Sequence, residues 1–228
     1  LRAMKIGVYG GSFNPPHLGH VRAAQACKQA LGLDRVLVIP ASIPPHKQLT
    51  SSSASPEERL ALTRLAFENL PGFEVLDLEI RREGKSYTVD TIRELKAQYA
   101  HDELFLMMGT DMFLSFQDWY SPQEIARCAQ LVCFSRYDAD AENRAALQKQ
   151  ADTLEKLYGQ RPVLLTNDCF DISSTEARRL LVFGIAEPYL PQAVLRRIED
   201  RALQCWRISG KTASTGWGGI TGHSRLTS

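Results

Sequence analysis

Two kinds of hydrophobic pattern alternate along the chain. Short apolar runs, typical of strands buried on both faces, occupy residues 5–9, 35–39, 104–108, 131–134 and 163–165. Residues 76–80 instead alternate apolar with acidic side chains, which predicts a strand with one exposed face. Residues 18–31 and 89–99 carry apolar side chains at helical spacing, and Gly32 follows the first of them as a stop. Strands and helices are therefore expected to alternate.

Further helices are predicted where a serine precedes a glutamate by three residues, the spacing of a capping box. The three such sequences are Ser55-Pro56-Glu57-Glu58, Ser121-Pro122-Gln123-Glu124 and Ser173-Ser174-Thr175-Glu176. Strands that alternate with helices predict an α/β fold with a doubly wound, mostly parallel sheet covered on both faces. In such folds the ligand lies in the crevice at the carboxyl ends of the strands, where the strand order reverses.

Residues 4–205 are expected to form a single domain, because no repeat or change of composition divides them. The remaining residues, 206–228, are predicted to be a flexible tail, since most of them are Gly, Ser or Thr with few apolar residues. The tail contains Gly210-Lys211-Thr212, which is similar to the end of a P-loop. Cys205 stands where that motif needs its first glycine, so no P-loop is predicted.

Composition limits which binding partners and which cellular compartment are expected. A formal net charge of +1 excludes a large basic field, so no nucleic-acid partner is expected. No apolar stretch approaches the ~18 residues of a membrane span, so no membrane partner is expected either. The five cysteines form no C-x-x-C pair, and Leu1–Met4 leads directly into a strand-like run without a signal-peptide core. A cytoplasmic protein with reduced thiols is the expectation, and the oligomeric state stays open.

The segment Gly10–His20 has the composition of a phosphate-binding loop. Gly10 and Gly11 would let backbone N–H groups approach a polyphosphate, and the helix start beyond them adds a favourable dipole. His17 and His20 lie three residues apart, so both can project from the same side of the first turn and donate to phosphate oxygens. The alternative is a glycine turn with two surface histidines. A metal site would need a third ligand, and the HExxH spacing is absent.

Two later segments also suit an anion. The Ser/Thr cluster of residues 172–175 is by itself an ordinary helix cap, but Arg178 about one turn further on could reach an anion held at that helix start. A charged hydrogen bond there contributes roughly 1.5–3 kcal/mol. In the long loop after the second predicted strand, Pro44 and Pro45 would stiffen the backbone and hold His46 and Lys47 over the strand ends. A solvated surface lysine is the alternative for Lys47.

Taken together, these segments resemble the nucleotidyltransferase superfamily, whose marks are G-G-[ST]-F-[DN]-P-x-H-x-G-H early and I-S-S-T-x-x-R late. Within it the chain is most similar to the nicotinate-nucleotide adenylyltransferases, from about residue 4 to about residue 201. Asn14 stands where many relatives carry Asp, a departure that leaves the loop intact. The supporting matches are residues 44–47, Ser86-Tyr87-Thr88-Val89-Asp90-Thr91, Gly109-Thr110-Asp111, Trp119-Tyr120, Ser135-Arg136 and Tyr189-Leu190-Pro191.

The resemblance implies a Rossmann-like nucleotidyltransferase fold and a reaction of NAD biosynthesis. ATP and nicotinate mononucleotide would give nicotinate adenine dinucleotide and pyrophosphate, by direct attack of the mononucleotide phosphate on the α-phosphorus. No protein nucleophile is needed, and catalysis would rest on positioning and charge stabilisation. Mg²⁺ would travel with the ATP phosphates, because it prefers phosphate and water ligands, and no protein metal site is expected.

The resemblance also implies which residues do what. The catalytic residues would be His17, His20, Lys47 and Arg178. ATP would be bound by Gly10, Gly11, Ser12, Phe13, His17, His20, Gly109, Asp111, Ile172, Ser174, Thr175 and Arg178. The mononucleotide would be bound by His46, Lys47, Thr88, Trp119, Tyr120 and Arg136. Trp119 would stack on the pyridine ring, although a tryptophan at this place could also be a core or rim aromatic.

Two other functions remain open from the sequence. Another member of the superfamily could use phosphopantetheine or glycerol phosphate, but such relatives tend to be shorter and lack the segments around Thr88 and Trp119. A nucleotide-binding regulator without turnover is a different class, and the intact His17, His20 and Arg178 argue against it. Release of pyrophosphate from ATP and nicotinate mononucleotide would separate these functions. The strictness of selection for the acid over the amide also stays open.

Overall fold

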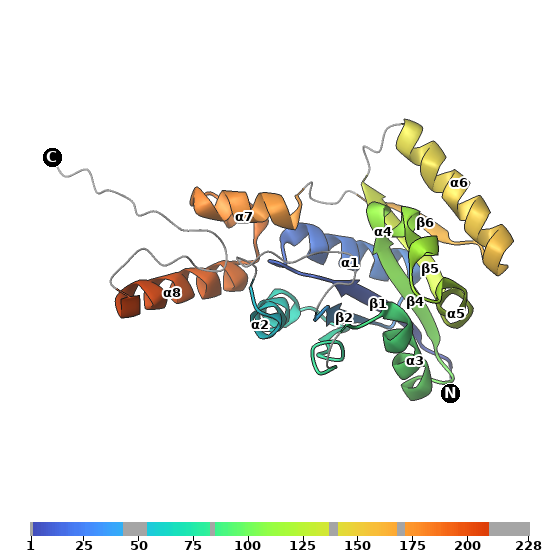
Figure 1. The fold of residues 1–228 in the computed structure, drawn as a ribbon, viewed down its shortest axis with the longest axis horizontal. Coiled ribbons are helices and arrows are strands. Elements are labelled where there is room, and N and C mark those ends of the chain that lie inside the picture. The colour runs from blue at the N-terminus through green and yellow to red at the C-terminus, as the bar shows by residue number, and fades with distance from the viewer. Residues whose placement is uncertain (1, 43–53, 83–84, 137–140, 168–171, 210–228) are drawn as a thin grey trace.

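The computed structural model describes residues 2–42, 54–82, 85–136, 141–167 and 172–209, and from 203 to 209 only the backbone. Within these residues a parallel six-stranded sheet has the order β3-β2-β1-β4-β5-β6 (Figure 1). This is the strand order of a doubly wound Rossmann fold, as predicted. The strands are β1 (Lys5–Gly11), β2 (Arg35–Pro40), β3 (Phe73–Val75), β4 (Glu103–Gly109), β5 (Gln130–Arg136) and β6 (Val163–Asn167).

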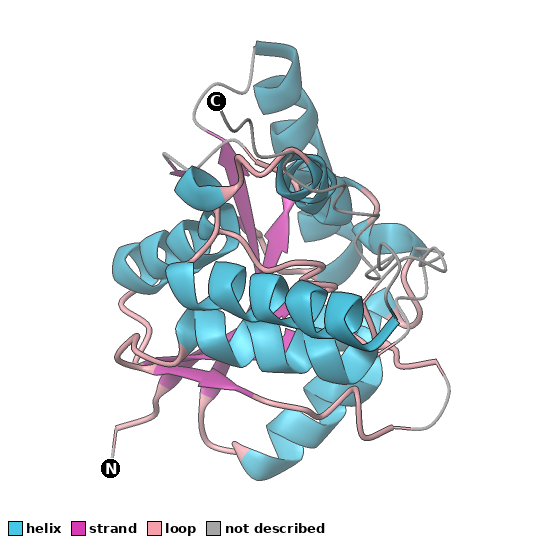
Figure 2. Ribbon diagram, turned by 90° about the vertical axis from the view of Figure 1, so that its left-hand side faces the viewer, coloured by secondary structure: helices cyan, strands magenta, loops and turns pink. Residues whose placement is uncertain are grey.

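Helices cover both faces of the sheet. They are α1 (Leu18–Leu31), α2 (Pro56–Phe67), α3 (Thr88–Gln98), α4 (Thr110–Leu114), α5 (Pro122–Cys128), α6 (Ala141–Tyr158), α7 (Ser174–Val182) and α8 (Gln192–Ser209), with the 3₁₀ turns η1 (Phe116–Asp118) and η2 (Glu187–Tyr189). Figure 2, seen from the side on which α7 and α8 lie in Figure 1, shows helices in front of the strands.

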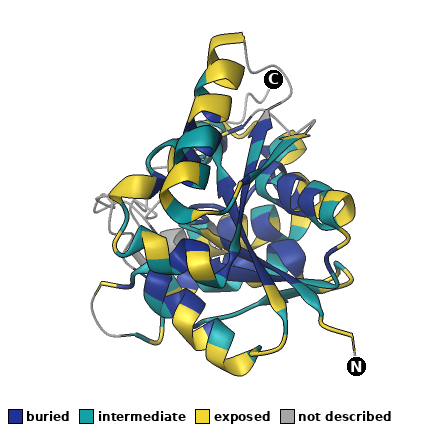
Figure 3. Ribbon diagram, turned by 90° about the vertical axis from the view of Figure 1, so that its right-hand side faces the viewer, coloured by how far each residue is buried: buried dark blue, intermediate teal, exposed yellow. Residues whose placement is uncertain are grey.

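Successive strand residues point to opposite faces and build two separate cores. Val36 and Val38 pack with α1, α2, α7 and α8, whereas Leu37 and Ile39 pack with α3, α5 and α6. The central strands are dark blue in Figure 3, and the helices turn their exposed residues outward. Burial on both faces explains why these strands read as continuous apolar runs rather than alternating ones.

The strand predicted at residues 76–80 is wrong. The paired strand there is β3, which lies immediately upstream, and only the Leu76 N–H continues the pairing, to the Val38 carbonyl at 2.9 Å. The chain then turns, with Arg81 N–H donating to the Asp77 carbonyl. Alternation was misleading because the acidic member Glu79 is buried like Leu78, where it accepts a hydrogen bond rather than facing water.

Two of the three predicted caps form. The Ser55 hydroxyl accepts from the Glu58 N–H at 3.2 Å, and the Ser173 hydroxyl accepts from the Glu176 N–H at 3.1 Å. Ser121 makes no side-chain cap bond, because its backbone is left-handed (φ 52°) rather than extended as in an ordinary N-cap residue. That predicted capping box is therefore wrong.

The predicted tail begins too early. α8 continues through Ser209, beyond the predicted boundary at residue 206, because the helical spacing of apolar residues extends to Ile208 before Gly210 interrupts it. Residues 210–228 lie outside the described residues. Over the part of the chain that the structure covers, no helix is both long and apolar enough to cross a membrane.

Candidate active site

The sheet reverses its strand order between β1 and β4, its two central neighbours. β1 leads into α1, which packs on one core, and β4 leads into α4, whose Phe113 packs on the other. Such a switch point leaves a crevice at the carboxyl ends of the strands. Gly10 and Gly11 end β1 and Gly109 ends β4, so the predicted ATP-binding glycines lie on adjacent strand ends.

The loop after β1 is a tight turn built on a buried aromatic ring. Phe13 adopts a left-handed backbone (φ 45°) and its side chain is fully buried, edge-on to Tyr9 at 5.4 Å between ring centroids. A Cβ on Gly11 would come within 3.0–3.3 Å of this ring, so the turn needs a glycine there. Among the described residues, no atom lies within 4 Å of a Cβ built on Gly10, which is exposed. A close approach of a bound phosphate would give that position a reason to be glycine.

His17 and His20 form a reciprocal cap at the start of α1. The Nδ1 of His17 accepts from the His20 N–H at 3.3 Å, and the Nδ1 of His20 accepts from the His17 N–H at 3.2 Å. Their rings are stacked, 3.6 Å apart between centroids. Because each Nδ1 is an acceptor, each neutral ring carries its proton on Nε2. Two Nε2–H donors on the same side of the helix start are what the spacing predicted, and they suit phosphate oxygens.

The loop is tied to the late Ser/Thr segment. The Ser174 hydroxyl donates to the Pro15 carbonyl at 3.2 Å. The Arg178 guanidinium donates to the Asn14 carbonyl at 2.6 Å and to the Thr175 hydroxyl at 3.0 Å. The two segments that the sequence assigned to phosphate, more than 150 residues apart, thus meet at one place. Burial lowers the pKa of Arg178, because desolvation penalises its charge, and an anion beside it would offset that cost.

One residue that sequence reasoning missed also holds this loop. Arg59 of α2 is fully buried and donates to the Ser12 carbonyl at 2.8 Å, the Ala41 carbonyl at 2.6 Å and the Ser42 carbonyl at 2.7 Å. It joins the end of β1 to the end of β2. The available signal was its position, since Arg59 lies on the same helical stripe as the apolar Leu62.

The predicted mononucleotide residues lie on the other side of the switch point. Thr88 is the first residue of α3, and the Tyr120 ring, on an exposed residue, lies 4.9 Å from that of Tyr87. Trp119 is half-buried, and its ring lies 5.3 Å from that of Phe116 at the edge of the second core. The rim-aromatic contact therefore exists, and stacking on a pyridine ring remains a prediction.

The structure describes the remaining predicted site residues to different extents. Asp111 is exposed in the first turn of α4, directly after Gly109, while Ile172 is buried just before α7. The backbone of Arg136 ends β5, but its side chain is not among those described. His46 and Lys47 lie outside the described residues. Their assigned roles stay predictions.

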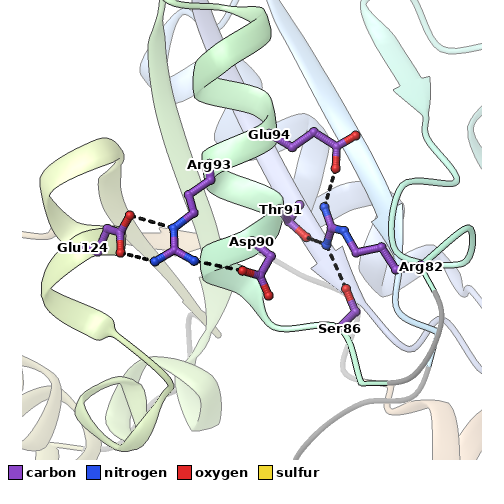
Figure 4. A network of polar contacts seen from close by, with 7 residues as sticks. All are labelled: Arg82, Ser86, Asp90, Thr91, Arg93, Glu94 and Glu124. Carbon is purple, nitrogen blue, oxygen red and sulfur yellow. Dashed lines mark hydrogen bonds and ion pairs between the residues drawn. The ribbon is translucent and has the colours of Figure 1, made fainter.

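A partly buried polar network lies at the start of α3 (Figure 4). Arg82 donates to the Ser86 hydroxyl at 2.9 Å and the Thr91 hydroxyl at 2.7 Å, and pairs with Glu94. The Thr91 hydroxyl donates in turn to the carboxylate of Glu79 at 2.8 Å, and burial raises the pKa of Glu79. The network spans Thr88, so it orients the first turn of α3.

A second contact in Figure 4 joins α3 to α5. Arg93 donates from Nε to the Glu124 carboxylate at 2.7 Å and also pairs with that carboxylate through Nη2. The same guanidinium bonds Asp90 one turn earlier, at 3.0 Å. Bidentate pairing of this kind fixes orientation as well as distance. The start of α3 and the segment that follows Trp119 and Tyr120 are therefore held in a defined relation.

The described part of the chain contains no group of three or more His, Cys, Asp and Glu side chains placed to hold a metal ion. Its cysteines Cys27, Cys128 and Cys133 form no disulfide. Burial raises the pKa of Cys133 to about 12, so this thiol is not a nucleophile at neutral pH. What the crevice offers is a set of glycine backbone, imidazole, hydroxyl and guanidinium donors, which suits phosphate.

Comparison with known proteins agrees with this donor set. The cytidylyltransferase-like family matches residues 8–180. A Geobacter sulfurreducens protein named probable nicotinate-nucleotide adenylyltransferase is 39% identical over 212 residues, covering 88% of this chain and 98% of that protein. A Shewanella woodyi protein of the same name is 36% identical over 210 residues, covering 88% of this chain and 99% of that protein.

A solved structure shares the fold. The Plasmodium falciparum nicotinic acid mononucleotide adenylyltransferase complexed with NaAD superposes with a TM-score of 0.70 at 16% identity, covering 88% of this chain and 97% of that one. At that identity the likeness shows the fold alone. The family follows from the curated relatives and the matched residues: this chain belongs to the cytidylyltransferase-like family and, within it, to the nicotinate-nucleotide adenylyltransferases.

Proposed function

We propose that the protein transfers the AMP of ATP to nicotinate mononucleotide, giving nicotinate adenine dinucleotide and pyrophosphate in NAD biosynthesis. The observation that carries this function is the joining of the Gly10–His20 loop to the Ser174–Arg178 segment at the switch point of the sheet. Relatives named for this reaction match nearly their whole length. Gly109 ends the neighbouring strand and Thr88, a proposed mononucleotide-binding residue, begins α3.

The chemistry needs no group on the protein to form a covalent bond. A phosphate oxygen of the mononucleotide forms a bond to the α-phosphorus of ATP, the bond from that phosphorus to the bridging β-oxygen breaks, and its electron pair leaves with pyrophosphate. The barrier falls because the reacting groups are held in line and the growing negative charge meets fixed donors.

His17 and His20 supply donors at the amino end of α1, where the helix dipole also favours an anion. Arg178 and the hydroxyls of Ser174 and Thr175 would hold the β- and γ-phosphates and the leaving pyrophosphate. This assignment is supported by the bonds of Ser174 and Arg178 to the loop and by the bond of Arg178 to the Thr175 hydroxyl. Lys47 would add positive charge from the loop after β2.

Mg²⁺ is part of the proposal as a companion of ATP. The residues at the loop are imidazole, hydroxyl and guanidinium groups, which complement phosphate oxygens, whereas Mg²⁺ prefers oxygen ligands from phosphate and water. Its contribution would be to neutralise charge on the phosphates. Activity should disappear with excess EDTA and return with added Mg²⁺, and full activity in EDTA would contradict the proposal. The free thiols support a cytoplasmic location.

A panel of acceptors tests the function. Pyrophosphate release would be measured with ATP, Mg²⁺ and one acceptor at a time: nicotinate mononucleotide, nicotinamide mononucleotide, phosphopantetheine or glycerol phosphate. The highest kcat/KM is expected with nicotinate mononucleotide. A preference for phosphopantetheine or glycerol phosphate would assign the chain to another activity of the superfamily. Binding of ATP without release of pyrophosphate for any acceptor would indicate a regulator.

A further inference from the structure

The loop after β1 turns three of its carbonyl groups toward donors supplied by other elements. The Ser12 carbonyl accepts from Arg59 of α2, the Asn14 carbonyl from Arg178 of α7, and the Pro15 carbonyl from Ser174 of α7. A carbonyl oxygen facing a phosphate would repel it, whereas a backbone N–H would bind it. A loop whose carbonyls are taken up in this way can present its N–H groups to an anion.

Arg59 differs from the two α7 residues in where it lies. Its side chain is fully buried beneath the loop, while the predicted phosphate-binding residues Ser174 and Arg178 remain partly accessible. Its guanidinium also spans two strand ends, because it bonds Ser12 after β1 as well as Ala41 and Ser42 after β2. Arg59 cannot touch a substrate from there, so any effect on the reaction must pass through the loop.

The guanidinium of Arg59 donates its hydrogen bonds to carbonyl groups, and the charge of the nearby Glu57 carboxylate only partly offsets its desolvation. Among the described residues no acidic side chain forms an ion pair with it. The adjacent Glu58 is buried as well, but it pairs with Arg197 and Arg201 of α8. Burial lowers the pKa of Arg59, because desolvation penalises its charge more than Glu57 stabilises it, and a polyphosphate bound on the other side of the loop would offset part of that cost.

We propose that Arg59 is the positioning residue of the phosphate loop: it withdraws the Ser12 carbonyl from the nucleotide and joins the loop to the end of β2. The inference rests on the proposed function, since it requires a nucleotide phosphate at the loop. Lysine cannot replace arginine here, because three carbonyls on two segments need the planar fork of donors that only a guanidinium has.

The test compares Arg59→Lys and Arg59→Met with wild type. Arg64→Lys and Arg64→Met, on the exposed face of the same helix, are the matched controls. In Arg59→Lys we expect kcat to fall about 10- to 100-fold, the size of effect that a small misplacement of reacting groups produces. The KM for the mononucleotide should change less than threefold, and the rise in melting temperature that pyrophosphate causes in wild type should be largely lost. Both Arg64 variants should behave as wild type.

A purely structural role would give a different result. If Arg59→Lys melts earlier but keeps the wild-type kcat and the full pyrophosphate-induced stabilisation, the inference is overturned. Arg59→Met loses the charge as well as the bonds and should be at least as impaired as Arg59→Lys in kcat. A folded Arg59→Met with normal kcat would also overturn it.

A measurement on the wild type covers the case in which no variant folds. The Arg59 Nε resonance should shift when pyrophosphate is added, while that of Arg64 stays fixed, and an unmoved Arg59 resonance contradicts the inference. Failure of the proposed function looks different: wild type would then release no pyrophosphate from ATP and nicotinate mononucleotide. If wild type is active and Arg59→Lys has the wild-type kcat, only the role of Arg59 is contradicted and the proposed function stands.

Discussion

His17 and His20 serve two purposes at once, and a substitution must separate them. Each Nδ1 caps the first turn of α1, while each Nε2–H is the donor suited to phosphate. An asparagine amide reaches about as far as Nδ1 and a glutamine amide about as far as Nε2. These two amides can therefore replace one function of a histidine without the other.

At position 20 the two amides should have opposite effects. His20→Asn keeps an acceptor for the His17 N–H and should retain the melting temperature, but loss of the Nε2 donor should lower kcat by about 100-fold. His20→Gln should keep more of kcat. Because it loses the cap, its unfolding free energy should fall by about 1 kcal/mol. Steady-state kinetics and urea unfolding of both variants check this. Equal losses of kcat and of ATP affinity in His20→Asn would instead assign the donor to uniform binding.

Gly10 and Gly11 are neighbours with different reasons to be glycine. The added Cβ of Gly10→Ala meets no atom of the described residues, so the variant should fold with an unchanged melting temperature. Contact of this Cβ with the bound phosphates should raise the KM for ATP by about tenfold or more. Gly11→Ala presses on the Phe13 ring and should lower the melting temperature. Thermal unfolding and kinetics of the pair provide the comparison. A Gly10→Ala protein with the wild-type KM for ATP would show that no ligand approaches Gly10 closely.

The sequence predicted the position of residues well where they form a motif. The His17/His20 pair and the Ser174–Arg178 segment lie at helix starts as their spacing indicated, and their binding of phosphate stays a prediction. Arg59 was missed, since a single arginine in a helix is usually solvated, and its place on the stripe of Leu62 indicates burial but not a partner. Its bonds to the ends of β1 and β2 depend on how α2 packs, which no local pattern contains.

At the scale of elements, the start of α3 depends on a carboxylate kept from water. Burial raises the pKa of Glu79 above its usual value of 4.5, and the Thr91 bond and the Arg82 charge oppose that rise. A raised pKa means that the folded state holds the proton more tightly than the unfolded state. The resulting stability is present at low pH and is lost as the pH rises through the folded pKa.

Glu79→Gln should therefore change how stability depends on pH. The glutamine carbonyl can still accept from Thr91 but carries no charge, so the unfolding free energy of the variant should gain on that of wild type as the pH rises above about 4.5. Urea unfolding at a series of pH values measures the difference. Glu94→Gln, which removes the exposed carboxylate on Arg82, is the control and should keep the wild-type pH slope. A difference that is constant with pH would contradict the explanation.

Helices and strands with a clear hydrophobic pattern in the sequence could be predicted, and those with a weak pattern could not. The strands buried on both faces and the helix at 18–31 follow directly from their apolar patterns. The helix α6 was missed because only a narrow stripe, with Leu147, Ala151 and Leu154, is buried on an otherwise polar segment. Its burial depends on the second core of the sheet, which no local pattern contains.

At the scale of the whole molecule, the sheet separates the segments proposed to bind the ATP phosphates from those proposed to bind the mononucleotide. The phosphate loop, α1 and α7 belong to the first core, whereas α3, α4, η1 and Trp119 belong to the second. The two halves meet only at the strand ends of the switch point, where phosphate would be transferred. A change deep on one side should therefore affect one substrate and leave the other nearly unaffected.

Trp119→Ala tests this separation. Stacking on an aromatic ring contributes roughly 1–3 kcal/mol where it has been measured for nucleic-acid bases, and a pyridine ring should be near the low end. Loss of about 1.4 kcal/mol corresponds to a tenfold higher KM for nicotinate mononucleotide. The KM for ATP should change little, because the proposed contacts of its phosphates lie on the Gly10–His20 loop and on α7, which pack with the other core.

Trp119→Phe is the matched control, since a phenylalanine ring can still pack near Phe116 and offer a face to the pyridine. Its KM for the mononucleotide should lie between those of wild type and Trp119→Ala. The melting temperatures of both variants report the loss of packing at the edge of the second core, which is separate from the loss of stacking. If Trp119→Ala lowers only the melting temperature, Trp119 is a rim aromatic and nothing more. If Trp119→Ala raises the KM for ATP instead, the division of the substrates between the two sides of the sheet is wrong.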